Sequence, residues 1–344
     1  MTAHALSDAP LIGLHEIRAA ARRLVGVTLR TPLVALGDPA RGHLLKAESL
    51  QPIGAFKLRG AYNAVASLTP EERARGVVTH SSGNHAQGVA RAARLFGCPA
   101  VVVMPENAPA LKRARVLADG AEVVTVGNAS SERAAMADRL AAERGLHLIP
   151  PFDDDRIIAG QGTCGLEIAE DLPGVSTVLV PVGGGGLAAG VATAIKLLLP
   201  GARVIGVEPE LAADARESLA RGEIVEWTAE QVSRTVSDGT RTQALGVRTF
   251  AHLRRYVDAI VTVSEEEILA GVRLAAEEAR LVVEPSGALT IAALRFHSAE
   301  VGAGEASELG AGGSGGPVVA VVSGGNVDPD AYRRYLEAPI PPPA

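Results

Sequence analysis

The sequence predicts an α/β fold with a parallel sheet and helices on both of its faces. Short, almost continuous apolar runs alternate along the chain with Ala-, Leu- and Arg-rich stretches of helical character. An uninterrupted apolar run is typical of a strand that is covered on both faces, and repeated strand–helix–strand order is typical of parallel sheets. With 344 residues, of which 47% are hydrophobic, the chain is long and apolar enough for two lobes or one large unit.

Seven apolar runs are expected to form strands, and each should be buried on both faces. In chain order they are Val77–His80, Ala100–Met104, Glu122–Val126, Thr177–Val182, Arg203–Val207, Ala259–Val263 and Pro317–Val322. Five stretches between them are expected to form helices, namely Ala86–Phe96, Ala110–Asp119, Ser131–Arg144, Gly186–Leu199 and Glu265–Ala279. The Gly-, Ala- and Ser-rich segment Gly302–Gly316 is expected to be a flexible loop, and the proline-rich segment Ala338–Ala344 a disordered tail.

Composition excludes several classes of protein. Aromatic residues make up 3% of the chain and the formal net charge is -6, so neither stacking platforms nor a basic stripe favours nucleic acid. Cys98 and Cys164 are too few for a disulfide framework or a cysteine-based zinc site, which fits a reducing cytoplasm. The N-terminal segment lacks the pattern of a signal peptide, and no apolar stretch reaches the roughly 20 residues that span a bilayer. We therefore expect a cytoplasmic protein without a nucleic-acid or membrane partner.

Four consecutive glycines, Gly183–Gly186, follow the expected strand Thr177–Val182 and precede an expected helix. Free backbone N–H groups at a helix N-terminus bind phosphate, and glycine lets the phosphate approach closely. The run has neither the spacing of the dinucleotide fingerprint nor the lysine of the nucleotide-hydrolase loop. It therefore indicates a phosphate site of another kind, with a tight strand-to-helix turn as the alternative.

Lys57 lies in the segment Gly-Ala-Phe-Lys-Leu-Arg-Gly at residues 54–60. Most helical lysines are simply solvated, and we expect Lys112 and Arg113 to be of that kind. The segment Ser-Ser-Gly-Asn-His at residues 81–85 follows the first expected strand and opens a helix. Small polar side chains and free N–H groups at the positive end of a helix suit a substrate carboxylate. The alternative is that Ser82 or Asn84 only caps the helix.

Two further segments complete a pattern that spans most of the chain. Ser-Gly-Gly-Asn at residues 323–326 follows the last expected strand, and residues 284–288 have the sequence Glu-Pro-Ser-Gly-Ala. In this order, the lysine segment, Ser-Ser-Gly-Asn-His, the four glycines and Ser-Gly-Gly-Asn resemble the fold-type II pyridoxal 5'-phosphate (PLP) enzymes, which are tryptophan synthase β-like. Within these enzymes the chain is most similar to the threonine/serine dehydratase (ammonia-lyase) and serine racemase family. The resemblance implies two open, twisted sheet domains with helices on both faces.

The resemblance also implies a role for each matched residue. Lys57 would carry PLP as a Schiff base and act as a catalytic base, Phe56 would pack on the pyridine ring, and Asn84 would bind the 3'-oxygen. The remaining cofactor contacts would come from Gly183, Gly184, Gly185, Gly186 and Leu187 at the phosphate, from Glu284, and from Ser323 at the pyridine nitrogen. The substrate would contact Ser81, Ser82, Gly83, Asn84, His85 and Asp238. Asp238 and the following glycine are also compatible with an ordinary Asp-Gly turn.

The segment after the strand Arg203–Val207 carries carboxylates at Glu208 and Asp214. With the backbone carbonyl of Ala212 they can surround a hard divalent ion, although by spacing alone an acidic loop is the simpler interpretation. The resemblance implies the metal site of the serine racemase-like branch, with magnesium expected and manganese or calcium as substitutes. In the same branch an arginine closes onto the substrate. Arg133 matches it loosely, and a solvated helix arginine is the alternative.

The activity implied by the resemblance is that of a lyase. It would remove the α-proton of L-threonine or L-serine, expel the β-hydroxyl, and release a 2-oxo acid and ammonia. Ser323 is an alcohol and cannot keep the pyridine nitrogen protonated, which favours elimination over transamination. Ser82, opposite Lys57, would permit racemisation, so serine racemase is the first alternative, and 3-hydroxyaspartate dehydratase belongs to the same branch. A non-catalytic PLP-binding protein, a cysteine synthase and a threonine synthase fit the segments less well.

We expect a discontinuous large cofactor-binding domain, residues 1–52 and 150–344, and a small domain, residues 53–149, that closes on the substrate. The site would lie between the domains, at the carboxyl ends of strands. The resemblance further implies a homodimer.

Overall fold

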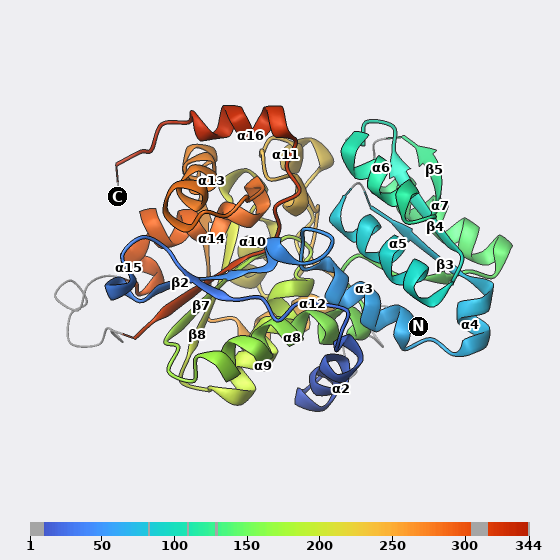
Figure 1. The fold of residues 1–344 in the computed structure, drawn as a ribbon, viewed down its shortest axis with the longest axis horizontal. Helices are drawn as coiled ribbons and strands as arrows, with labels where there is room; N and C mark the ends of the chain where they lie inside the picture. The colour runs from blue at the N-terminus through green and yellow to red at the C-terminus, as the bar shows by residue number, and fades with distance from the viewer. Residues whose placement is uncertain (1–9, 82, 109, 128–129, 304–315, 343–344) are drawn as a thin grey trace.

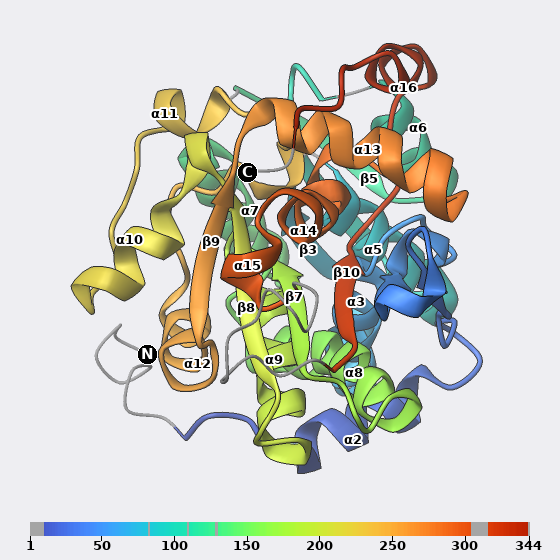
Figure 2. The same cartoon turned by 90° about the vertical axis from the view of Figure 1, so that its left-hand side faces the viewer.

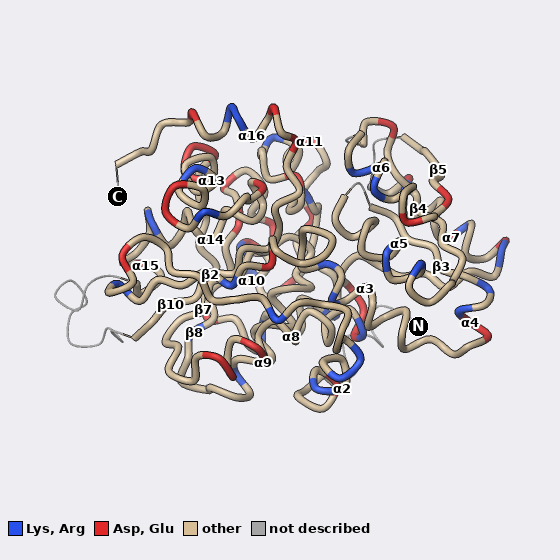
Figure 3. The backbone as a smooth tube through the Cα atoms, in the orientation of Figure 1, with Lys and Arg blue, Asp and Glu red and all other residues tan. Residues whose placement is uncertain are grey.

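The computed structural model describes residues 10–81, 83–108, 110–127, 130–303 and 316–342. Most of the expected flexible loop Gly302–Gly316, the last two residues of the expected tail and the candidate second base Ser82 lie outside the described residues. Figure 1 shows two lobes, with the larger sheet on the left and the smaller sheet on the right. Basic and acidic residues are interspersed over both lobes (Figure 3).

The larger sheet has six strands in the order β1-β2-β10-β7-β8-β9. Their bounds are β1 Leu33–Ala35, β2 His43–Ala47, β7 Thr177–Pro181, β8 Arg203–Pro209, β9 Ala259–Val263 and β10 Val318–Val322. Neighbouring strands run parallel, except that β1 pairs with β2 in the antiparallel direction. Along β7, Val178 and Val180 belong to one core cluster and Leu179 to the other, so this central strand is buried on both faces, as predicted.

Helices cover both faces of the larger sheet (Figure 2). On one face lie α2 Leu14–Leu24, α8 Asp155–Asp171, α9 Gly186–Leu198 and α12 Val247–Tyr256. On the other face lie α13 Glu265–Ala279 and α14 Pro285–Phe296, with α16 Pro329–Leu336 packed on α13. Shorter elements complete this lobe: η1 Pro39–Arg41, η2 Glu48–Leu50, η3 Glu210–Ala212, α10 Asp214–Arg221, α11 Ala229–Ser233, η4 Asp238–Thr240 and α15 Ser298–Val301.

The smaller sheet has four parallel strands in the order β5-β4-β3-β6. The strands are β3 Val77–His80, β4 Ala100–Pro105, β5 Glu122–Val126 and β6 His147–Leu148. Helices α3 Lys57–Ala66, α5 Asn84–Phe96 and α6 Ala110–Ala118 pack on one face, α7 Ser130–Arg144 on the other, and α4 Pro70–Arg75 lies at the side. No helix of the described residues is both long and apolar enough to cross a membrane.

All seven expected strands and five expected helices are present, with their ends shifted by at most two residues. The short strands β1, β2 and β6 were not predicted. In β2 the polar residues His43 and Lys46 interrupt the apolar run, and Lys46 is nevertheless fully buried because its charge is paired. The prediction that every strand is covered on both faces is wrong for β5, where Glu122 and Thr125 are exposed because β5 forms an edge of the smaller sheet.

Candidate active site

A cavity of about 320 Å³ lies between the two sheets, at the carboxyl ends of β3, β7 and β10. Every residue predicted to contact the cofactor or the substrate lines this cavity, among the residues that the structure describes. The cavity therefore brings together segments that are far apart in the chain: Lys57 and Ser323 are separated by 266 positions. The other contributors are the segment after β3, the four glycines, Asp238 and Glu284. Arg133 also lines it, which places this arginine at the site rather than in bulk solvent.

Lys57 is the first residue of α3 and is half-buried in the cavity wall. Its ammonium Nζ donates a hydrogen bond to the backbone oxygen of Pro151 at 2.9 Å and lies 5.2 Å from the centre of the Phe56 ring. Desolvation by burial lowers the pKa of Lys57 to about 8. A lysine with such a pKa is neutral in a substantial fraction of molecules near physiological pH, so it can serve as a nucleophile or a base.

The start of α3 is fixed by the strand segment that follows β10. The backbone N–H of Phe56 donates to the oxygen of Ser323 at 3.0 Å, and Ala55 forms an isolated antiparallel bridge with Gly324. Lys57 is thereby attached directly to the end of a central strand of the larger sheet.

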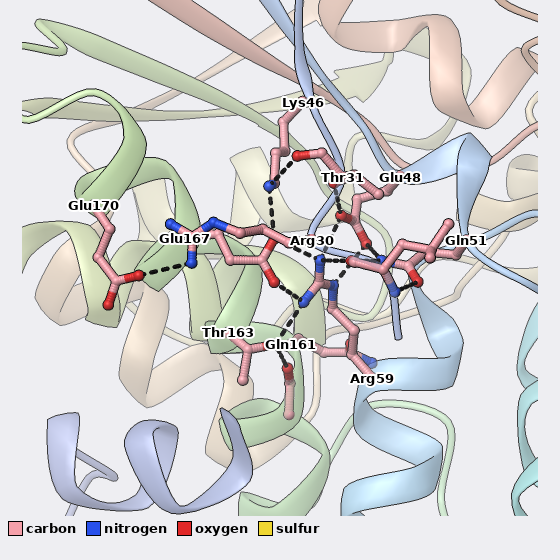
Figure 4. A network of polar contacts seen from close by, with 12 residues as sticks. Arg30, Thr31, Lys46, Glu48, Gln51, Arg59, Gln161, Thr163, Glu167 and Glu170 are labelled. Carbon is pink, nitrogen blue, oxygen red and sulfur yellow. Dashed lines mark hydrogen bonds and ion pairs between the residues drawn. The ribbon is translucent and has the colours of Figure 1, made fainter. Parts of the chain in front are cut away.

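The first turn of α3 is also held by a buried network of charged groups around Arg59 (Figure 4). The Arg59 guanidinium donates to Glu48 at 2.7 and 2.8 Å and to Glu167 at 2.6 and 2.8 Å. Lys46 donates to Glu167 at 2.6 Å and to the oxygen of Thr31 at 2.7 Å. Buried charges are tolerated when they are paired and hydrogen-bonded, as the two cations and two carboxylates are here. The network attaches α3 to β2 and α8, so the larger sheet determines where Lys57 lies.

The four glycines form the turn between β7 and α9. Gly185 has a φ of +88°, which favours glycine, and a Cβ atom on Gly184 would overlap the ring of Phe152. Thr249 holds the turn by donating from its hydroxyl to the oxygen of Gly184 at 2.8 Å. α9 begins at Gly186 without a side-chain cap, and the first N–H groups of a helix have no partner within the helix. The turn is therefore a cradle of backbone N–H groups beside Lys57.

Helix α5 begins at Asn84, and its N-cap is Gly83, which has no side chain to cap it. The alternative that Asn84 caps this helix is therefore wrong, and Ser82 lies outside the described residues. Ser81 accepts a hydrogen bond from the N–H of Gly83 at 3.2 Å. The ring of His85 is buried against the oxygen of Ile149 at 3.2 Å, and desolvation lowers the pKa of His85 well below its usual value. His85 is therefore neutral, its Nδ1 has no hydrogen-bond partner among the described residues, and it lines the cavity from the first turn of α5.

The prediction that Lys112 is solvated is wrong, whereas Arg113 is exposed as predicted. Lys112 lies on α6, only 6% exposed, and its Nζ lies 2.6 Å from Oδ2 of Asp238 and 3.9 Å from Oε2 of Glu284. Lys112, Val116 and Asp119 are all buried and lie at the spacing of one helix face, but only Val116 is apolar, so the apolar pattern of the sequence did not indicate the burial of Lys112.

Glu284 is buried at the N-terminus of α14, and burial raises its pKa to about 7. Its Oε1 accepts a hydrogen bond from Nδ2 of Asn84 at 2.5 Å. Asn326, which the sequence did not identify as a site residue, donates from its Nδ2 to Oδ1 of Asn84 at 2.8 Å. Ser323 donates from its hydroxyl to the oxygen of Ser286 at 3.2 Å.

The predicted metal residues lie outside the cavity, where β8 leads into α10. Glu208 and Asp214 are fully buried, and Glu208 accepts hydrogen bonds from the N–H groups of Ala215 and Arg216 at 3.1 and 2.8 Å. Neither carboxylate oxygen of Asp214 has a hydrogen-bond partner among the described residues. Burial raises the pKa of Glu208 well above its usual value and that of Asp214 to about 7, and the nearby Asp214 adds to the shift of Glu208.

Two neighbouring buried carboxylates, of which Asp214 has no hydrogen-bond partner for either oxygen among the described residues, fit a cation. The described residues contain no cluster of three or more His, Cys, Asp or Glu side chains suited to a metal ion. A cation here would therefore need backbone or water oxygens as further ligands, such as the predicted carbonyl of Ala212.

Comparison with known proteins gives concordant matches. The sequence profile of a family described as "Pyridoxal-phosphate dependent enzyme" matches residues 26–324. The L-threonine ammonia-lyase of Thermotoga maritima is 43% identical, covering 95% of this chain and 78% of the relative. The L-threo-3-hydroxyaspartate ammonia-lyase of Saccharomyces cerevisiae is 39% identical, covering 93% of this chain and 95% of the relative. The structure of maize serine racemase is 35% identical with a TM-score of 0.85, covering 95% of this chain and 98% of that one.

Proposed function

Because the chain belongs to the family of pyridoxal-phosphate dependent enzymes, we propose that it is an ammonia-lyase that converts L-threonine, L-serine or both to a 2-oxo acid and ammonia. The observation that carries this proposal is the position of Lys57, whose amine has a pKa lowered to about 8 and lies in the same cavity as the four-glycine turn. The similarity to the L-threonine ammonia-lyase over 95% of the chain supports the choice of reaction.

The residues present fit PLP. Lys57 would hold the aldehyde end, the N–H groups at Gly183–Leu187 the phosphate, and Asn84 the 3'-oxygen, while Phe56, Glu284 and Ser323 would complete the cofactor site. A side chain on Gly184 would overlap Phe152, and one on Gly183 would approach Thr240 to 3.0 Å, so only glycine keeps this cradle open. When bound, PLP supplies an electron sink for the α-carbon of the amino acid, which no protein side chain provides.

The chain itself would orient the substrate and move its proton. The N–H groups at the start of α5, beside Ser81, Gly83 and Asn84, lie at the positive end of a helix and would hold the α-carboxylate. The neutral amine of Lys57 would then remove the proton from the α-carbon as a general base. Ser323 is an alcohol, so it cannot hold a proton on the pyridine nitrogen as a carboxylate would, and fast loss of the β-hydroxyl is favoured over transamination.

The unpaired oxygens of Asp214, with Glu208 and the carbonyl of Ala212, would bind magnesium, for which manganese or calcium could substitute. Because these residues lie outside the cavity, we assign the ion a structural role at the junction of β8 and α10.

A dicarboxylic substrate, 3-hydroxyaspartate, is the second candidate. Arg133 lines the cavity, and its guanidinium has several N–H donors, so a second substrate carboxylate could contact it there. The similarity to an L-threo-3-hydroxyaspartate ammonia-lyase points the same way. Serine racemase activity would require Ser82 as a second base. Because the chain is similar to maize serine racemase, the assay below also measures inversion of serine.

A substrate panel tests the proposal. The protein, supplied with PLP and magnesium, would be assayed with L-threonine, L- and D-serine and the 3-hydroxyaspartate isomers for 2-oxo acid, ammonia and inversion. We expect oxo acid and ammonia from L-threonine or L-serine. Lys57→Ala should abolish the activity, while Lys196→Ala, which alters a surface ion pair with Asp258, should retain it. Absence of oxo acid from every substrate, or full activity of Lys57→Ala, would refute the proposal.

We further propose a cytoplasmic homodimer with the two domains predicted from the sequence. Leu29, Leu50 and Val282 are 50%, 44% and 53% exposed. Their chain segments lie close together, because Gln51 exchanges hydrogen bonds with the backbone of Leu29, and a Cβ atom on Gly325 would meet both Ser49 and Val282. A second copy of the chain would bury this apolar surface. Leu50→Glu should therefore shift the mass in solution from dimer to monomer.

A further inference from the structure

The side-chain amide of Asn84 is held between two polar side chains. Its Oδ1 accepts a hydrogen bond from Asn326 at 2.8 Å, and its Nδ2 donates to Glu284 at 2.5 Å. The two ends of an amide have nearly the same shape but opposite hydrogen-bonding character, so the neighbours decide which end points where. The orientation of Asn84 therefore depends on the orientation of Asn326.

The amide of Asn326 cannot turn over. Its Nδ2 also donates to the backbone oxygen of Ile53 at 2.8 Å, and that oxygen can only accept. Its Oδ1 accepts from the guanidinium of Arg115, which can only donate. Asn326 is only 6% exposed, and Gly54, with a φ of +74°, leaves the space that the amide fills. Turning the amide would place donor against donor and acceptor against acceptor in a buried site.

The four side chains form a chain of hydrogen bonds with one direction. Arg115 on α6 donates to Asn326, Asn326 donates to Asn84 at the start of α5, and Asn84 donates to Glu284 at the start of α14. Glu284 uses one of the two N–H groups on Nδ2 of Asn84, and Asn84 lines the cavity. The second N–H is thus available to a ligand.

We propose that Asn326 is a positioning residue that makes Asn84 offer an N–H group, rather than its oxygen, to the 3'-oxygen of the bound cofactor. This inference rests on the proposed function, because it needs PLP beside Asn84. If the amide of Asn84 were reversed, its oxygen would face the oxygen of the cofactor. An inverted hydrogen bond to a charged group should weaken cofactor binding by about tenfold or more.

Asn326→Asp tests the proposal because it keeps the size of the side chain and its bond with Arg115. It replaces the donor at Nδ2 with an oxygen, which then faces two acceptors, the oxygens of Ile53 and Asn84. We expect the Kd for PLP to rise about tenfold or more, and the absorption band of the bound cofactor to shift in wavelength or in the pH at which it changes.

A matched control is available on α3. Asn63 is also buried, accepts from Arg23 at 3.0 Å and donates to the oxygen of Arg156 at 2.7 Å, but it does not line the cavity. Asn63→Asp makes the same chemical change, so it should lower stability in the same way and leave the spectrum of the bound cofactor unchanged. If both variants alter the spectrum alike, the effect is one of folding and the proposal is wrong.

A double variant tests whether Asn326 acts on the bound cofactor through Asn84. In an Asn84→Ala background there is no amide to orient, so adding Asn326→Asp should produce no further spectral shift. An equal further shift in that background would overturn the proposal, as would an unchanged spectrum and PLP affinity in Asn326→Asp alone. Should Asn326→Asp fail to fold, Arg115→Met should weaken PLP binding in the same direction. Arg113→Met, which replaces an exposed arginine of the same helix, is its control, and equal affinities of these two variants would refute the proposal. If the wild-type chain binds no PLP, or Lys57→Ala binds it equally well, the proposed function itself fails.

Discussion

The ammonium group of Lys112 lies 2.6 Å from Oδ2 of Asp238 and joins α6, beside the smaller sheet, to η4, beside the larger sheet. Both residues line the same cavity as Lys57, and the buried Glu284 lies 3.9 Å from the same ammonium. The positive charge of Lys112 therefore offsets the negative charges of two carboxylates. One of them, Glu284, also accepts a hydrogen bond from Asn84.

Replacing Lys112 by methionine should impair the enzyme. Asp238 and Glu284 would lose their shared cation, and the buried Glu284 would become harder to keep ionised beside Asn84. We expect kcat/KM for the best substrate to fall about tenfold or more, which corresponds to the loss of one charged interaction. Steady-state kinetics would measure this, and Arg113→Met, which alters the exposed neighbour, should leave kcat/KM unchanged. Equal effects of the two substitutions would show that the ion pair is unimportant for catalysis.

The rate at which the apoenzyme takes up PLP should depend on the pKa of Lys57. Burial lowers this pKa to about 8, and only the neutral amine attacks an aldehyde. The rate should therefore rise with pH through about 8 and level off above it. Stopped-flow absorbance from pH 6.5 to 10 would record the profile. A midpoint near 10.4, the value of an unperturbed lysine, would contradict the proposed environment of Lys57.

Arg59→Met should destabilise the fold strongly. The substitution would remove the main counter-ion of Glu48, which is buried, and of Glu167, which is nearly buried. Breaking a buried ion pair in this way costs roughly 3–5 kcal/mol of folding free energy. Urea unfolding would measure the change in the free energy of unfolding. Arg30→Ala, which removes an exposed arginine paired with Glu170 and Asp171, should cost only about 0–1 kcal/mol. A loss for Arg59→Met no larger than that for Arg30→Ala would mean that the network adds little stability.

Removal of divalent cations should lower the melting temperature of the wild-type protein. A cation that binds only the folded state stabilises it by mass action, and the unpaired oxygens of Asp214 are the proposed ligands. Thermal unfolding would be followed with EDTA and then with excess magnesium, which should restore the melting temperature. In Asp214→Asn neither addition should have an effect. A wild-type melting temperature that is independent of the cation would refute the metal site.

The central strands and most helices were predictable because their evidence is local. An apolar run such as Val178–Val182, which is followed by Gly183, is visible without knowing what packs on it. The strands β1 and β2 were missed because β1 is only three residues long and β2 carries His43 and Lys46. Lys46 can be buried in a strand only because Glu167, 121 positions away, pairs with it. Such a partner cannot be inferred from the residues around Lys46.

The candidate site was predictable as a set of segments but not as a set of interactions. From the sequence, Lys57, the four glycines and the segments after β3 and β10 were each recognisable as short motifs, and the family that they resemble in this order implied that they belong to one site. The tertiary structure alone decided that Lys112 pairs with Asp238, 126 positions away, and that Asn326 orients Asn84 across 242 positions. These contacts depend on how the two sheets pack against each other, and the burial that this packing creates determines the charges and hydrogen bonds of the side chains between them.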